Sequence, residues 1–140
     1  MLTALPVRAK TTYPAFHVVK DPNCGCCGDW IALVEQAGFP VTVEDMPNDA
    51  LARLKAKAGI PPAMTSCHTA RVEGYVIEGH VPLADIRRLL DSRPDAIGLS
   101  VPGMPWGSPG MGPEAEREAY DVHLIRKDGT TRIFNHYPAA

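Results

Sequence analysis

Three cysteines lie within four residues, at Cys24, Cys26 and Cys27, and a helix-forming pattern follows them directly. The first turn of a helix offers unpaired N–H groups and the positive end of the helix dipole, both of which lower the pKa of a thiol. Thiolates are the nucleophiles of disulfide exchange and the soft ligands of Cu(I), zinc and iron–sulfur clusters. We therefore expect this segment to carry the protein's chemistry.

The spacing of the cysteines favours one local disulfide. Cys26 and Cys27 are sequence neighbours, which seldom reach the Cα separation and torsion that an unstrained disulfide needs. A disulfide is instead expected between Cys24 and Cys27, which are the catalytic pair if the protein is redox active. Cys26 and Cys67 then remain as the only other thiols in the chain.

Four further side chains are candidate metal ligands: His68, His80, Met104 and Met111. Successive strand residues point to opposite faces, so Cys67 and His68 both face one site only at a bulge or a strand end. His80 lies at a loop-like position, where a ligand role and a structural role are equally weighted. The two methionines have the alternative role of anchoring a loop in the core. The remaining histidines, His17, His123 and His136, are expected to be structural or surface residues.

Composition excludes several classes of partner. The 14 basic and 16 acidic residues give a net charge of -2 without a run of either sign, which argues against nucleic acid and anionic membranes. No segment approaches the ~20 apolar residues of a membrane span, and the N-terminus lacks the apolar stretch of a signal peptide. We expect a soluble chain without a membrane span.

Hydrophobic periodicity predicts an α/β domain with the element order β-α-β-α-β-β-α, which is the order of the thioredoxin fold. Pro61-Pro62 is the candidate for the proline that such folds place opposite the cysteines. The expected elements are a strand over 16–20, a helix from the cysteines to Gly38, a strand over 41–44, a helix capped by Asn48 or Asp49, strands over 67–73 and 75–78, and a helix from 83 that ends before Pro94.

Two additions to this pattern follow it in the chain. Residues 94–113 are rich in Pro, Gly and Met without a helical or strand period, and we expect a long loop that covers the site. Asp128-Gly129 predicts a β-hairpin over 120–137. The expected organisation is a flexible segment over 1–15 and one domain over 16–140.

These segments resemble the CopG-like metal-binding proteins, a bacterial family. The resemblance extends over roughly residues 16–111 and rests on four motifs that occur in order. They are Asp21-Pro22-Asn23-Cys24-Gly25-Cys26-Cys27-Gly28-Asp29-Trp30, Ser66-Cys67-His68-Thr69-Ala70, Gly74-Tyr75-Val76-Ile77-Glu78-Gly79-His80-Val81-Pro82 and Val101-Pro102-Gly103-Met104-Pro105-Trp106-Gly107-Ser108-Pro109-Gly110-Met111.

The resemblance implies a thioredoxin-like fold, copper binding through the Cys-x-Cys-Cys segment with Cys67 nearby, and a role in copper resistance. It also implies the periplasm, with copper ions and other periplasmic copper-handling proteins as partners. Two features depart from the family: members often carry an acidic residue where this chain has Gly112, and the usual export signal is absent. Cytoplasmic localisation is therefore the alternative.

The number and type of the candidate ligands fit copper binding, as the resemblance implies. A single tetrahedral zinc ion bound by Cys24, Cys27, Cys67 and a histidine leaves Cys26 unused, whereas several Cu(I) ions bridged by shared thiolates use every sulfur. We therefore expect more than one Cu(I) per chain, coupled to thiol redox chemistry. Two alternatives stay open: a metal-free thiol-disulfide oxidoreductase and a zinc or iron–sulfur module.

Overall fold

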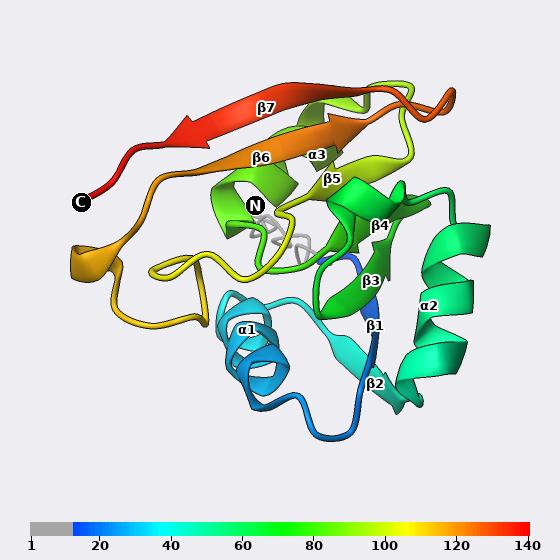
Figure 1. Ribbon diagram of the computed structural model, residues 1–140, viewed down its shortest axis with the longest axis horizontal. Helices are drawn as coiled ribbons and strands as arrows, with labels where there is room; N and C mark the ends of the chain where they lie inside the picture. The colour runs from blue at the N-terminus through cyan, green and yellow to red at the C-terminus, as the bar shows by residue number, and fades with distance from the viewer. Residues whose placement is uncertain (1–12) are drawn as a thin grey trace, which may run out of the picture.

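The protein is built on one mixed sheet of seven strands, in the order β2-β1-β3-β4-β5-β6-β7 (Figure 1). The computed structural model describes residues 13–140, so most of the segment expected to be flexible lies outside the described residues. The elements are β1 (Phe16–Lys20), α1 (Gly25–Gln36), β2 (Val41–Asp45), α2 (Asn48–Lys57), a 3-10 turn η1 (Pro62–Met64), β3 (His68–Val72), β4 (Tyr75–Glu78), α3 (Leu83–Ser92), β5 (Gly98–Ser100), a 3-10 turn η2 (Glu114–Glu116), β6 (Tyr120–Ile125) and β7 (Thr131–Tyr137).

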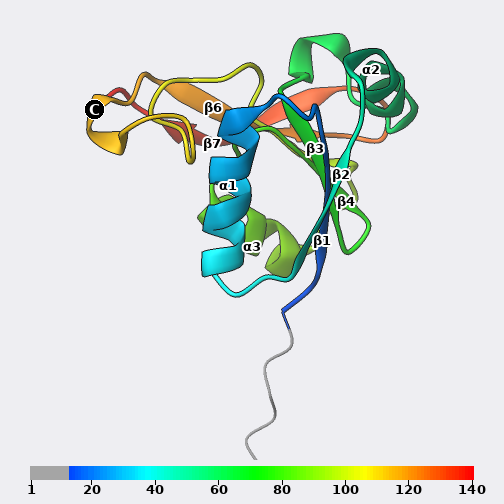
Figure 2. The same cartoon turned by 90° about the horizontal axis from the view of Figure 1, so that it is seen from below.

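The first four strands and three helices confirm the predicted thioredoxin-like arrangement. β1 and β2 run parallel across the α1 connection, whereas β3 is antiparallel to both β1 and β4. Helices α1 and α3 cover one face of the sheet and α2 lies against the other (Figure 2). Pairing parallel strands requires a crossover connection of this kind, while β3 and β4 need only the turn at Gly74.

Helix α1 is held in place by an apolar stripe that differs in part from the one its spacing predicts, which is Trp30, Leu33, Val34 and Ala37. Trp30, Ile31 and Val34 are buried in the main core with residues of α3 and of the central strands, whereas Leu33 is 36% exposed. The indole nitrogen of Trp30 donates a hydrogen bond of 3.0 Å to the carbonyl of Val81, in the connection between β4 and α3. The helix that begins at the cysteines is thereby anchored to the segment that carries His80.

Two details differ from the sequence-based prediction. Residues 98–100 of the expected loop form β5, which pairs with both β4 and β6. A strand of three residues is too short to display a period of two, so its signal was only the apolar character of buried Leu99. Helix α2 has Pro47 at its N-cap position and makes no side-chain cap, so neither Asn48 nor Asp49 caps it.

The C-terminal hairpin forms as predicted and extends the sheet. β6 and β7 pair in antiparallel fashion, with one register shift between Val122 and His123. Asp128 closes the turn by accepting hydrogen bonds from the backbone N–H and the hydroxyl of Thr130. The hairpin therefore adds two strands to the sheet beyond β5.

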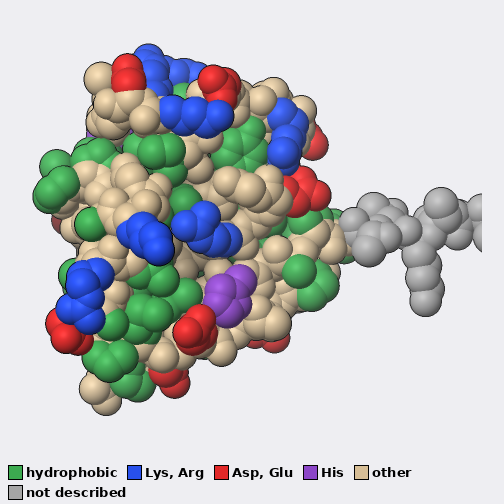
Figure 3. Space-filling model, turned by 90° about the vertical axis from the view of Figure 1, so that its right-hand side faces the viewer, with side chains coloured by type: hydrophobic (Ala, Val, Ile, Leu, Met, Phe, Trp, Pro, Cys, Tyr) green, Lys and Arg blue, Asp and Glu red, His purple; other side chains and the backbone are tan. Residues whose placement is uncertain are grey.

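No helix among the described residues has the length and apolar character needed to cross a bilayer. On the face to the right of Figure 1, basic and acidic side chains both occur among hydrophobic ones (Figure 3).

Strand direction brings four chain segments together at one end of the sheet. Lys20, the last residue of β1, pairs with His68, the first residue of β3. Thr69 pairs with Glu78, the last residue of β4, which in turn pairs with Ser100, the last residue of β5. Four chain segments therefore meet at this end of the sheet. Three of them follow β1, β4 and β5, and the fourth precedes β3.

The close pairing of β4 with β5 depends on glycine at position 98. A Cβ atom on Gly98 would lie 1.8 Å from the carbonyl oxygen of Val76, so Gly98→Ala forces the two strands apart. We expect the free energy of unfolding to fall by about 3 kcal/mol, as for other overpacked positions. Gly28→Ala is the control, because its Cβ meets nothing within 4 Å on α1 and should raise stability by ~0.5–1 kcal/mol. Urea denaturation measures both, and equal stabilities would contradict the assigned β4–β5 pairing.

Candidate metal centre

The turn after β1 delivers the cysteine motif into the first turn of α1. The carboxylate of Asp21 accepts a hydrogen bond of 2.7 Å from the N–H of Asn23, which turns the chain toward the helix. Cys24 occupies the N-cap position and makes no side-chain cap, so its sulfur is free for other bonds. The first turn contains no acidic residue, and the sulfurs therefore lie at a helix end that favours negative charge.

The structure contains the expected disulfide between Cys24 and Cys27, whose Cα atoms are 5.5 Å apart. Cys26 and Cys67 are the free thiols of the described chain. Cys27 is fully buried whereas Cys24 and Cys26 are partly exposed. Access from solvent to the disulfide is therefore through Cys24.

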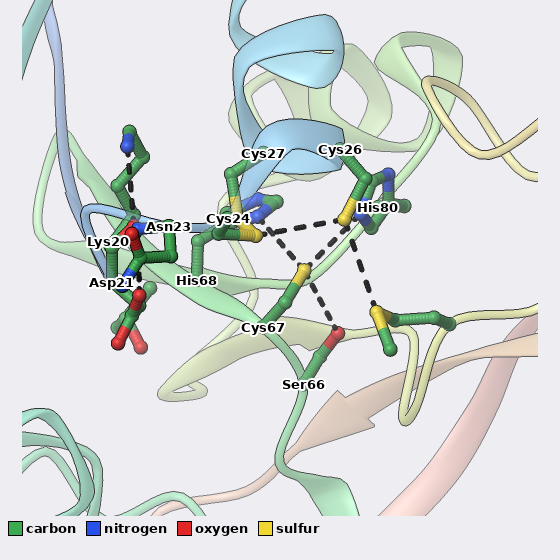
Figure 4. The surroundings of a disulfide bond; sticks show 12 residues. Lys20, Asp21, Asn23, Cys24, Cys26, Cys27, Ser66, Cys67, His68 and His80 are labelled. Atoms are coloured by element: carbon green, nitrogen blue, oxygen red, sulfur yellow. Dashed lines mark hydrogen bonds between the residues drawn. A yellow bond between two sulfur atoms is a disulfide. The ribbon is translucent and has the colours of Figure 1, made fainter. Parts of the chain in front are cut away.

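Cys67 comes to this motif from the other side of the site, directly before β3 begins. The sulfur atoms of Cys24, Cys26, Cys27 and Cys67 all lie within 4.8 Å of one another. In Figure 4 these sulfurs face one another between the start of α1 and the segment that enters β3, and Cys24 Sγ lies 3.6 Å from Cys26 Sγ. All four cysteines form one cluster.

The prolines expected opposite the cysteines lie in the segment before β3. Pro62 begins the short turn η1 and lines the same cavity as Cys24 and Cys67. Cys67 lies between this turn and the start of β3, so a thiol is closer to β3 in sequence than either proline. The role of Pro61-Pro62 opposite the cysteines stays a prediction.

His80 is oriented by the loop that follows β5. Its Nδ1 lies 2.7 Å from the carbonyl oxygen of Pro109, which can only accept, so Nδ1 carries the proton. The other nitrogen, Nε2, lies 3.2 Å from Cys67 Sγ. Burial lowers the pKa of His80, which favours a neutral imidazole with a lone pair directed at the sulfur. A backbone carbonyl in this role is the usual support of a metal-binding histidine.

His68 lies beneath the cluster and is fully buried. Its Nδ1 is 3.4 Å from Cys67 Sγ, and this contact is possible because Cys67 precedes the first residue of β3, as the strand-end alternative requires. Its ring packs on Trp30 with centroids 4.5 Å apart, and Nε2 has no hydrogen-bond partner. Burial, together with the nearby His80 and Lys55, lowers the pKa of His68 to about 3. The Cys67, His68 and His80 ligand atoms also lie within 4.8 Å of one another.

The two methionines of the loop differ. Met104 Sδ lies 3.9 Å from Cys26 Sγ, and its side chain is 52% exposed, so Met104 is not a core anchor. Met111 is held by backbone hydrogen bonds to Ser108 and Gly107, and among the described residues its sulfur makes no hydrogen bond like the one between Cys26 and Met104. The loop therefore contributes Met104 and the Pro109 carbonyl.

The environment of Cys67 differs from that of the helix cysteines. Burial raises the pKa of Cys67 to about 11, so its thiol stays protonated near neutral pH in the absence of a metal. A cation bound by the cluster would reverse this preference, since metal binding displaces thiol protons.

Next to Cys24 and Cys67, a cavity of about 600 Å³ opens to solvent along the apolar face of α2.

Sequence reasoning did not identify a buried polar group behind Cys67. Glu78 on β4 and Lys55 on α2 form an ion pair of 2.6 Å, and the Glu78 carboxylate accepts the backbone N–H of Ser66 at 2.9 Å. A signal was available: Glu78 ends the apolar run of β4, and Lys55 follows Leu51 by four residues on the inward face of α2. Charged residues at such positions indicate buried partners.

Comparisons with known proteins find one family and two solved structures to which this chain is similar. Residues 64–111 match a family described as protein of unknown function DUF411. Two solved structures of a copper resistance protein CopG, forms 1 and 2, are 42% and 43% identical to the chain, each with a TM-score of 0.82. Form 1 matches over 89% of this chain and 98% of its own, and form 2 over 90% and 99%. No curated protein sequence matches the chain.

The buried neutral His68 makes stability depend on pH. Its pKa is about 3 in the folded protein and 6.5 in its ordinary state, so between these values the unfolded chain binds the extra proton. The metal-free protein should therefore lose stability as pH falls from 6.5 toward 3, by up to ~1.4 kcal/mol per pH unit from this residue. His68→Phe, which keeps an aromatic ring on Trp30, should remove that part of the slope. Urea denaturation between pH 4 and 7 measures it, and parallel profiles for both proteins would contradict the assignment.

Proposed function

The chain belongs to the family of the copper resistance protein CopG, and on this premise we propose that it binds Cu(I) in a multinuclear thiolate cluster formed by Cys24, Cys26, Cys27 and Cys67. The observation that carries the proposal is the convergence of four sulfurs within 4.8 Å. Soft thiolates select Cu(I), and sharing each sulfur between two ions uses all four cysteines. One tetrahedral zinc ion bound with a histidine needs only three of them.

The neighbouring imidazoles and thioether complete the proposed ligand set. His80 presents Nε2 and His68 presents Nδ1 to the Cys67 side of the cluster, and Met104 approaches the Cys26 side. Both imidazoles are favoured in their neutral form, which is the form that binds metal. We propose His80, His68 and Met104 as additional ligands, and Met111 as a structural residue of the loop.

Copper and the disulfide compete for the same atoms. A dithiol reductant converts the Cys24–Cys27 disulfide into two thiols while its own two sulfurs form a disulfide, so two electrons and two protons pass to the protein. Binding of Cu(I) by the four thiols then releases their protons. The proposed copper capacity is therefore set by the redox state of Cys24 and Cys27.

The proposed cellular setting is the periplasm. Disulfides persist in oxidising compartments and are rare in the cytosol. In the periplasm, the proposed copper-binding capacity would depend on the state of the disulfide. The proposed partners are other copper-handling proteins of the periplasm, with which this protein would exchange Cu(I). Resistance follows because thiolate-bound Cu(I) is removed from solution.

A second candidate function is thiol-disulfide exchange without metal. The observation in its favour is the cavity of about 600 Å³ that reaches Cys24, the partly exposed sulfur of the disulfide. In that reaction Cys24 would be attacked by a substrate thiolate and Cys27 would leave. This candidate requires neither Cys26 nor Met104, which distinguishes it from copper binding.

Reduced protein should bind more than one Cu(I) per chain. A competition titration against a Cu(I) chelator under anaerobic conditions measures stoichiometry and affinity. Cys26→Ser is the diagnostic variant, because it should lower the copper stoichiometry while leaving reduction of a model disulfide substrate intact. One-to-one binding, or zinc retained in preference to copper, would contradict the multinuclear cluster. Unchanged copper binding by Cys26→Ser would favour a site that excludes this sulfur.

Met104 and Met111 provide a matched pair of substitutions. Met104→Leu should weaken Cu(I) binding by about tenfold, because it removes a soft ligand 3.9 Å from Cys26 Sγ. Met111→Leu makes the same chemical change in the same loop and should leave the affinity unchanged. The chelator competition measures both, and equal affinities for the two variants would show that Met104 is not a ligand.

A further inference from the structure

A buried ion pair lies immediately behind the Cys67 side of the cluster. Glu78 is fully buried and Lys55 is 6% exposed. The Glu78 carboxylate accepts hydrogen bonds from Lys55 Nζ at 2.6 Å, the Thr69 hydroxyl at 2.6 Å and the Ser66 backbone N–H at 2.9 Å. Lys55 Nζ also donates to the Thr69 hydroxyl at 2.9 Å. Every polar atom of this group has a partner within it.

The contacts of Glu78 extend to three candidate ligands. Its backbone leads through Gly79 to His80, and its side chain holds Ser66, the residue before Cys67. The hydroxyl of Ser66 donates to the carbonyl of Gly103, the residue before Met104, at 2.5 Å. One carboxylate therefore connects the segments of Cys67, His80 and Met104.

The packing around this carboxylate leaves little freedom for the Ser66 segment. A Cβ atom on Gly79 would lie 2.4 Å from Ser66 Oγ and 2.6 Å from the carbonyl oxygen of Val101. Ser66 also forms a parallel bridge with Gly103. The backbone at Cys67 is thus enclosed by β4 on one side and by the loop after β5 on the other, with the Glu78 hydrogen bond fixing its position.

A contribution to stability does not by itself explain why this ion pair is present. The free energy needed to remove both charges from water offsets their attraction, and proteins in which a buried ion pair is replaced by apolar residues are often equally stable. Fully satisfied buried networks instead hold one arrangement of the groups they bond. Here the bonded group is the backbone N–H next to a metal-binding cysteine.

We propose that Glu78, neutralised by Lys55, is the positioning residue for the Cys67, His80 and Met104 side of the site. The ion pair fixes the Ser66–Cys67 backbone so that Cys67 Sγ faces both His80 Nε2 and the cysteines of α1. The role in copper binding rests on the proposed function, whereas the positioning of the Cys67 thiol is a property of the metal-free protein. The two parts can therefore be tested separately.

Glu78→Gln tests the positioning, because it keeps the shape of the side chain and removes the charge that Lys55 and the Ser66 N–H bind. The readout is the rate at which iodoacetamide alkylates Cys67 relative to Cys26 in the oxidised, metal-free protein, measured by peptide mass spectrometry. Release of the Ser66 segment exposes Cys67, so this ratio should rise by at least about fivefold, the change that loss of one net hydrogen bond produces.

Asp85→Asn is the matched control. Asp85 is also a buried carboxylate, but it accepts its hydrogen bonds from Asn135 and Tyr137 of the C-terminal hairpin. It should lower the thermal midpoint without changing the alkylation ratio. The proposal would be overturned by an unchanged alkylation ratio in folded Glu78→Gln or by an equal rise of this ratio in Asp85→Asn. Either result would mean that the ion pair contributes only to the stability of the fold.

Thr69→Val keeps the test decisive if Glu78→Gln does not fold. It removes the hydrogen bond from the Thr69 hydroxyl to Glu78 and the one from Lys55 to that hydroxyl, and it leaves the ion pair in place. It should raise the alkylation ratio by a smaller factor than Glu78→Gln does, and an unchanged ratio in the folded variant would overturn the proposal.

In the copper titration, Glu78→Gln should bind Cu(I) at least about tenfold more weakly than Asp85→Asn. Absence of copper binding by the wild-type protein would refute the proposed function while the alkylation result still decides the positioning role.

Discussion

The antiparallel register of β3 against β1 is the constraint on which the site depends. Because Lys20 pairs with His68, the chain leaves β1 toward the cysteine motif at the edge where it enters β3 from Cys67. The motif and Cys67 are about forty residues apart in sequence but share this edge as a direct result of strand direction. A shift of one residue in this pairing would turn His68 to the other face of the sheet, away from the cysteine cluster.

Burial at this end of the sheet shifts the pKa of the Cys67 thiol and the pKa values of the two imidazoles in opposite directions. It raises the pKa of Cys67 and lowers the pKa of His68 and His80, so each group is favoured in its neutral form without metal. Neutral imidazoles are ready to bind a cation, whereas the Cys67 thiol must first lose a proton. In the proposed function, the cation that binds here would have to displace the proton of the Cys67 thiol, as soft cations do.

The loop after β5 acts mainly through its backbone. The carbonyl of Pro109 sets the tautomer of His80, and the carbonyl of Gly103 holds Ser66. Met104 adds a side chain whose sulfur lies 3.9 Å from Cys26 Sγ. Proline and glycine suit this role because the loop must present carbonyl groups at fixed positions, and proline leaves little chain entropy to be lost on folding.

The sequence by itself determined the elements whose signals are local. The helix after Cys24, the hairpin at Asp128-Gly129, the Cys24–Cys27 disulfide and the thioredoxin-like order of elements all follow from periodicity, turn residues and short spacings. Tertiary structure alone decided which distant residues meet. The short strand β5 is stabilised by its neighbours on both sides, Met104 comes close to Cys26, and Glu78 on β4 contacts Lys55 of α2 and Ser66 of the segment before β3. These pairings depend on strand register and packing between segments far apart in the chain, and such contacts leave no periodic pattern in the sequence.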